Sequence, residues 1–243
     1  MISLRSALPS FLLGLALFAS AAAHAVPIAT WDIANATGQS AAVGFTETGI
    51  SATDLVGVGV NPWPNTAQDG FVVASGWAPG LAPDPSLYFE WSFTIDAVTE
   101  IDLTSIQLAL LRGVQGPNHG AELWDLHASL DGFGSSDVSL ATLDISASGV
   151  DEQTIFNVDL STLGTLQNAT VTFRLYGYDY TSAADYSGLG NDSGWVITGT
   201  GADVVLDGIV VPEPSLALLV GVGLLLLGSL APRPAQSSAK RSR

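Results

Sequence analysis

Apolar and polar residues alternate with a period of two along much of the chain between residues 26 and 210. The segment LYFEWSFTI shows this most clearly: one face would carry Leu87, Phe89, Trp91, Phe93 and Ile95, and the other Tyr88, Glu90, Ser92 and Thr94. Successive side chains of a strand point to opposite faces of a sheet. The alternation therefore predicts a half-buried antiparallel strand.

Several further segments repeat this pattern. IQLALL predicts an inward-facing set of Ile106, Leu108 and Leu110, and ELWDLHASL predicts a second set, Trp124, Leu126, Ala128 and Leu130, before the turn dipeptide Asp131-Gly132. The pattern continues in IFNVDL, ATVTFRLYGY and ADVVLDGIV, and helical signals are few. Short strands separated by turn-forming loops are typical of a sandwich. We expect an all-β, antiparallel β-sandwich of the jelly-roll-like kind.

The segment TVTFRLYGYDY predicts a candidate binding surface. Val171, Phe173 and Leu175 would face the core, which places Arg174, Tyr176, Tyr178 and Tyr180 together on the opposite, wet face. Flat phenol rings with hydroxyl tips suit the apolar face and the edge hydroxyls of a sugar ring. These four residues are therefore candidate glycan-binding residues. The alternative is that tyrosine is there only because it favours strands, or that a neighbouring loop covers the row.

The next segment, DYTSAADYSGLGND, is rich in oxygen ligands. Asp179, Asp185 and Asp192 are candidate metal ligands, with Asn191 beside them. Ca²⁺ prefers such oxygen donors, although their order does not match the EF-hand pattern. The sequence predicts structural calcium here as one possibility and no other cofactor.

Charge is distributed unevenly along the chain. Of the 23 acidic residues only Glu213 lies outside residues 26–210, and of the seven cations only Arg112 and Arg174 lie inside, so this region holds 22 acids and a net charge near −20. Without a basic patch to release phosphate counterions, nucleic acid is excluded as a partner. The chain has no cysteine, which excludes disulfides, thiol catalysis and thiolate metal sites.

The first 25 residues have the layout of a secretory signal peptide. One cation, Arg5, precedes an apolar stretch, and the small residues Ala23 and Ala25 form an A-x-A cleavage site. Cleavage after Ala25 would start the mature chain at Val26.

The last residues, 211–243, form three parts. Residues 211–215 contain Pro212, Glu213 and Pro214, residues 216–231 are uninterrupted apolar, and residues 232–243 hold the basic tail. The apolar run would be about 24 Å long as a helix, slightly short for a hydrocarbon core of about 30 Å. Lys and Arg after a span remain cytoplasmic, which puts residues 26–210 on the outer side of the inner membrane. The two prolines hold Glu213 extended, as a protease substrate requires.

This three-part C-terminus resembles the PEP-CTERM sorting signal. The resemblance implies processing by an exosortase, a multi-pass membrane enzyme, in a Gram-negative bacterium that makes extracellular polysaccharide. It also implies a single-pass membrane intermediate and a final place at the cell surface or in the extracellular matrix, as in a biofilm. One departure is that the basic residues are spread behind PRPAQSSA rather than packed against the apolar run.

The region 26–210 is long enough for one domain, and it resembles lectin-like jelly rolls through SLDGF and the closing strand VVLDGIVV. His127 shares a strand face with Asp125, which could orient its imidazole, but the sequence places no nucleophile beside them, so we predict no catalytic residue. The leading hypothesis is an exported, non-catalytic protein that associates with exopolysaccharide. The alternatives are a secreted polysaccharide hydrolase using paired carboxylates, and a purely structural matrix protein.

Overall fold

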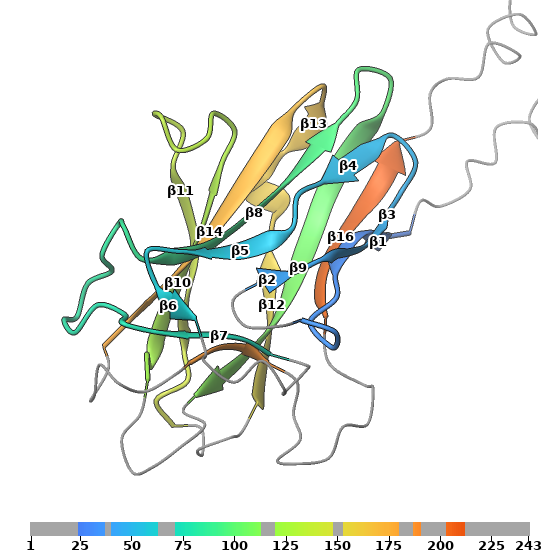
Figure 1. The fold of residues 1–243 in the computed structure, drawn as a ribbon. Coiled ribbons are helices and arrows are strands. Elements are labelled where there is room, and N and C mark those ends of the chain that lie inside the picture. Colours follow the sequence, from blue (N-terminus) through green and yellow to red (C-terminus); the bar gives the residue numbers. More distant parts are fainter. Residues whose placement is uncertain are drawn as a thin grey trace, which may run out of the picture. The chain divides into compact units, whose positions relative to one another are not determined.

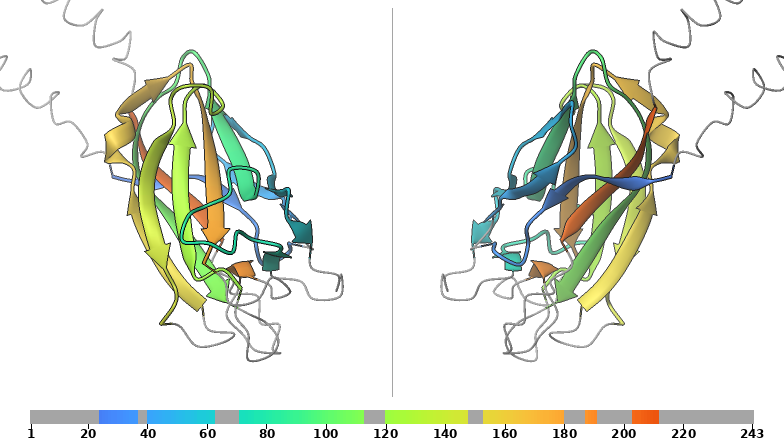
Figure 2. Two further views of the ribbon diagram at one scale, coloured as in Figure 1. Left: turned by 90° about the vertical axis from the view of Figure 1, so that its left-hand side faces the viewer. Right: turned by 90° about the vertical axis from the view of Figure 1, so that its right-hand side faces the viewer.

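A computed structural model describes residues 24–36, 40–62, 71–112, 120–147, 153–179, 187–190 and 203–211. In these residues the fold is all-β, with two antiparallel sheets and one short 3-10 turn, η1 (Ser161–Leu163). Figure 2 shows from two sides that strands of the two sheets lie face to face. The expected all-β, antiparallel sandwich is confirmed. No helix in these ranges is long and apolar enough to cross a membrane, and residues 216–231 lie outside them.

Sheet A is organised around its longest strand, β9. Its path runs β3-β1-β16-β9-β15-β7-β6, and β12 and β13 also pair with β9. Its strands are β1 (Val26–Trp31), β3 (Val43–Thr46), β6 (Asn61–Pro62), β7 (Phe71–Ser75), β9 (Glu100–Arg112), β12 (Gln153–Asp159), β13 (Thr165–Gln167), β15 (Ser187–Gly190) and β16 (Val204–Val211). The first and last of these strands, β1 and β16, are neighbours. The domain therefore begins and ends within one sheet.

Sheet B carries the segments that the sequence analysis singled out. Its order is β11-β10-β14-β8-β5-β2, with β4 also paired to β8. Its strands are β2 (Ser40–Ala41), β4 (Ile50–Ala52), β5 (Leu55–Val58), β8 (Tyr88–Ile95), β10 (Leu123–Ser129), β11 (Val138–Asp144) and β14 (Thr170–Tyr178). Figure 1 shows β14 running beside β8, as their pairing requires. The strand β14 thus lies between β8 and β10, in the middle of the sheet.

The core between the sheets contains most of the predicted inward-facing residues and is rich in tryptophan. Trp31, Trp77, Trp91 and Trp124 are buried, and Trp77 meets Trp124 edge-on with ring centroids 4.9 Å apart. In LYFEWSFTI the residues Phe89, Trp91, Phe93 and Ile95 are buried, as the alternation predicts. Leu130 departs from its prediction: β10 ends at Ser129, and Leu130 is exposed.

Gly177 allows β14 to pass over the tryptophan pair. A Cβ at this position would lie 3.0 Å from Trp77 Cδ2, Trp124 Cζ3 and Ala121 Cβ, which is closer than most real Cβ contacts. Glycine therefore fits where the backbone of β14 passes close to these side chains. The neighbouring residues Tyr176 and Tyr178 consequently lie on the outer side of sheet B.

Candidate functional site

The outer face of sheet B, which points away from the core, is the candidate functional site. The cross-strand register places Arg174 of β14 between Glu90 of β8 and His127 of β10. In the same register Tyr176 lies opposite Asp125. With Tyr88, Phe133 and Asp137, these residues form a group that we call the Arg174 cluster: Tyr88, Glu90, Asp125, His127, Phe133, Asp137, Arg174 and Tyr176.

Arg174 is held on three sides in this cluster. Its Nε donates a hydrogen bond to Glu90 Oε2 at 2.7 Å. Its guanidinium carbon lies 4.2 Å from the centroid of the Tyr88 ring and 4.1 Å from that of Phe133, which is the geometry of a cation–π contact. Burial works to lower the pKa of Arg174, but its bonds to Glu90 and Tyr176 outweigh burial and raise that pKa. The positive charge of Arg174 is therefore already paired with Glu90 and covered by two aromatic rings within the cluster.

The tyrosine row lies on the predicted face but is not open to solvent. Tyr176 is 7% exposed and Tyr178 is 5% exposed. The Tyr176 ring meets Tyr88 and His127 edge-on, with centroids 5.5 Å and 5.3 Å away. The expectation of a row of exposed rings is therefore wrong for these two residues, because neighbouring side chains cover them. Tyr180 lies outside the described residues, and the glycan-binding role of the four candidates stays a prediction.

Tyr178 is tied down at its hydroxyl end. Its hydroxyl donates a hydrogen bond to Asp125 Oδ1 at 3.1 Å. Burial, followed by the negative charge of Asp125, raises the pKa of Tyr178 to about 12. The Tyr178 ring is therefore buried and its hydroxyl already bonded within the protein.

His127 has a different partner from the expected one. Its Nδ1 lies 2.7 Å from Asp137 Oδ1, while Asp125 is engaged by Tyr178. The strand shows an irregularity between Leu126 and His127 where it pairs with β11, and the loop that joins the two strands brings Asp137 alongside. Asp137 therefore orients the imidazole, a role that the sequence analysis had given to Asp125.

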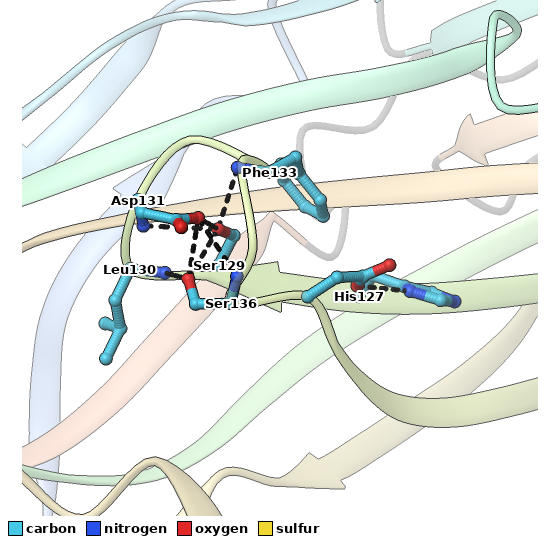
Figure 3. A network of polar contacts seen from close by, with 7 residues as sticks. His127, Ser129, Leu130, Asp131, Phe133 and Ser136 are labelled. Carbon is cyan, nitrogen blue, oxygen red and sulfur yellow. Dashed lines mark hydrogen bonds and ion pairs between the residues drawn. The ribbon is translucent and has the colours of Figure 1, made fainter.

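The loop between β10 and β11 is organised around one carboxylate (Figure 3). Asp131 accepts hydrogen bonds from the Ser129 and Ser136 hydroxyls, each at 2.8 Å, and from the Ser135 amide at 2.7 Å. The Gly134 and Ser136 amides and the Ser135 hydroxyl complete the set. These bonds, with the side chain of Ser136 contributing most, lower the pKa of Asp131. The predicted Asp131-Gly132 turn is thus part of a longer loop with an ionised centre.

This loop places Phe133 against Arg174 in the cluster. The Phe133 amide donates to Ser129 Oγ at 2.8 Å, and the residue adopts a positive φ of 65°, directly after Gly132 at 69°. A positive φ is costly for a phenylalanine, and the hydrogen bonds around Asp131 and Ser129 hold it in place. The position of the Phe133 ring on Arg174 therefore depends on Asp131.

We expect acid to weaken this loop. The pKa of Asp131 in the folded protein lies below its unfolded value of about 3.9, so its stabilising effect is present above that pH and is lost as the pH falls. Asp131→Asn should lower stability at neutral pH and should also reduce the loss of stability on acidification between about pH 5 and pH 2. Denaturant titrations of both proteins across this range measure the difference. Parallel curves for the two proteins would contradict the role given to Asp131.

Sequence reasoning missed two aromatic members of the cluster, Tyr88 and Phe133. Tyr88 could have been found, since it stands on the polar face of LYFEWSFTI two residues before Glu90. Phe133 carried no such signal, because a loop residue has no periodic face. Both rings are partly exposed, unlike Tyr176 and Tyr178.

Hydroxyl pairs continue the outer face of sheet B beyond the cluster. Thr94 and Thr170 are joined by a 2.9 Å hydrogen bond, and Thr53 and Ser92 by one of 3.1 Å. Thr94 also lines a shallow, open pocket with Gly49, Ile50, Ser51 and Asp96. The face thus has an aromatic and charged half and a hydroxyl half.

The calcium prediction is untested in this structure. Of its candidate ligands, Asp185 and Asp192 lie outside the described residues, and Asp179 lies just after β14 with a φ of 56°. Across the described ranges no group of three or more His, Asp and Glu side chains is arranged to hold a metal ion.

Comparisons with known proteins point to no family: no protein-family model and no curated protein matches the chain. Among solved structures it is similar to the C-terminal domain of a chitobiase from Bacteroides fragilis, with 16% identity over 69% of this chain and 99% of that one and a TM-score of 0.30. It is also similar to a structure whose description is the structural basis for the promiscuous specificity of carbohydrate-binding modules from the β-sandwich superfamily. The identity is 7% over 78% of this chain and 85% of that one, and the TM-score is 0.24. TM-scores this low support no argument about function.

Proposed function

We propose that this protein is exported, processed at its C-terminus by an exosortase, and then associates non-catalytically with extracellular polysaccharide through the outer face of sheet B. The signal peptide, the Pro212-Glu213-Pro214 triplet and the basic tail support the route. A jelly-roll-like sandwich is the finer fold that we propose, and the adjacency of β1 and β16 in one sheet supports it. After processing, the protein would lie at the cell surface or in the matrix of a Gram-negative bacterium.

The observation that supports binding is the pair of partly exposed rings, Tyr88 and Phe133, held against Arg174. Rings that are fixed before a ligand arrives lose little conformational entropy on binding. Around them lie the polar groups of Glu90, His127 and Asp137, which can accept or donate hydrogen bonds at the edge of a sugar ring. Fixed rings beside hydrogen-bonding groups make a surface suited to sugars.

Replacing Phe133 or Tyr88 with alanine should weaken retention by polysaccharide about tenfold, because a ring contact near the centre of an interface is worth about 1–2 kcal/mol. The full chain, purified in detergent, would be run through gels containing neutral, acidic or amino-bearing polysaccharides, and retardation would be measured. Phe45→Ala is the matched control, since Phe45 lies in sheet A and is 45% exposed. Melting temperatures would show that each variant is folded.

Equal retention of Phe133→Ala, Tyr88→Ala and the wild type would contradict binding at this face. New reducing ends released from the polysaccharide would instead favour the hydrolase alternative. Folded protein that is not retarded by any polysaccharide would favour the structural alternative.

A further inference from the structure

The carboxylates of the Arg174 cluster are only partly used by the protein itself. Glu90 accepts through Oε2 from Arg174, Asp125 through Oδ1 from Tyr178, and Asp137 through Oδ1 lies against His127. Within the described part of the chain, the second oxygen of each carboxylate makes no hydrogen bond. The side chains of Glu90 and Asp137 are 32% and 53% exposed, so a ligand can reach them. The cluster therefore offers carboxylate acceptors beside its two partly exposed rings.

The cluster also carries more negative than positive charge. The cluster contains three carboxylates, those of Glu90, Asp125 and Asp137, and one guanidinium, that of Arg174. The guanidinium is already paired with Glu90 and covered by the rings of Tyr88 and Phe133, and the His127 imidazole lies against Asp137. The whole domain holds 22 acidic residues and two cations. A uronate, sulfate or phosphate group arriving here would meet repulsion with no free cation of the cluster to receive it.

An ammonium group fits the same surroundings. It offers three donors and a positive charge, and charge-assisted hydrogen bonds to carboxylates are about twice as strong as neutral ones. The rings of Tyr88 and Phe133 already hold one cation, the Arg174 guanidinium, which shows that this surface accepts positive charge. We infer that the polysaccharide taken by the outer face of sheet B carries protonated amino groups and is not acidic. This inference rests on the proposed function and names its substrate class.

Tetramers of three sugars provide the test: glucosamine, N-acetylglucosamine and galacturonic acid. The first two differ only in whether the amino group is free and charged or acetylated. Calorimetric titration of the full chain in detergent, at mildly acidic pH and moderate salt, should show the glucosamine tetramer binding about tenfold more tightly than the N-acetylglucosamine tetramer. The galacturonic acid tetramer should bind most weakly.

Two variants locate the effect. Asp137→Asn and Glu90→Gln keep the side-chain shape and remove one negative charge each, and each should reduce the preference for the amino tetramer about three- to tenfold. Glu100→Gln is the matched control, since it removes the same charge at the start of β9 in sheet A and should leave the preference unchanged. If Glu90→Gln disturbs Arg174 and lowers the melting temperature, Asp137→Asn still tests whether the carboxylates of the cluster cause the preference for the amino tetramer.

The outcomes separate the inference from the proposed function. Equal binding of the amino and acetylated tetramers, with Phe133→Ala weakening both, would overturn the amino-group inference and leave glycan binding at this face intact. Tightest binding of the acidic tetramer would do the same. A preference for the amino tetramer that Glu100→Gln reduces as much as Asp137→Asn would reflect net charge alone and would overturn the inference. Absence of binding to every tetramer and polysaccharide would overturn both.

Discussion

Replacing Tyr176 or Tyr178 with alanine should lower the free energy of unfolding by about 2–4 kcal/mol. Both side chains are buried, at 7% and 5% exposure, and the Tyr176 ring packs edge-on against Tyr88 and His127. Removing either ring leaves a gap that its neighbours cannot fill without moving. Denaturant titration, with circular dichroism to show that the sheets persist, measures the loss.

Tyrosine-to-phenylalanine variants serve as the matched controls for this result. Tyr178→Phe keeps the ring and loses only the hydrogen bond to Asp125, so it should cost about 1 kcal/mol. Phe45→Ala removes a ring that is 45% exposed and should cost less than the buried tyrosines. If Tyr178→Ala proved no more costly than Tyr178→Phe, the ring would contribute nothing to packing, and an open tyrosine surface would again have to be considered.

Replacing Pro212, Glu213 and Pro214 together with alanine should trap the protein in the inner membrane with its C-terminus intact. The apolar residues 216–231 would still halt the chain, and the basic residues behind them would still remain in the cytoplasm. The prolines no longer hold residue 213 extended, so the proposed exosortase would lose its substrate. Mass spectrometry of the wild-type surface protein should find a start at Val26 and no peptide from residues 216–243.

Ser215→Ala is the control for this experiment, because it changes the residue next to the triplet and leaves the triplet itself unchanged. Its tail should be removed as in the wild type. A wild-type surface protein that still contains Arg243 would contradict the sorting proposal and would leave a permanent membrane anchor as the explanation of residues 216–231. If the triple-alanine variant were processed as fully as the wild type, the protease would not recognise the triplet.

The sequence by itself determined which side of β8 and of β14 faces the core. Phe89, Trp91 and Phe93 are buried, as are Val171, Phe173 and Leu175, and Arg174 lies opposite them as predicted. The reason is local: once a segment is extended, the backbone alone sends successive side chains to opposite faces. The alternation also identified the all-β class, because two apolar faces can be buried only against each other.

Only the tertiary structure decided what lies on the outer face. The exposure of Tyr176 and Tyr178 depends on Tyr88, His127 and Asp125, which come from other strands and cannot be read from the alternation in β14. The pairing of His127 with Asp137 depends on the path of a loop, and the ring of Phe133 reaches Arg174 only because six hydrogen bonds to Asp131 fix that path. A period-two pattern assigns a face within one strand, whereas these contacts join residues through register and loop closure, which the pattern of a single segment does not contain.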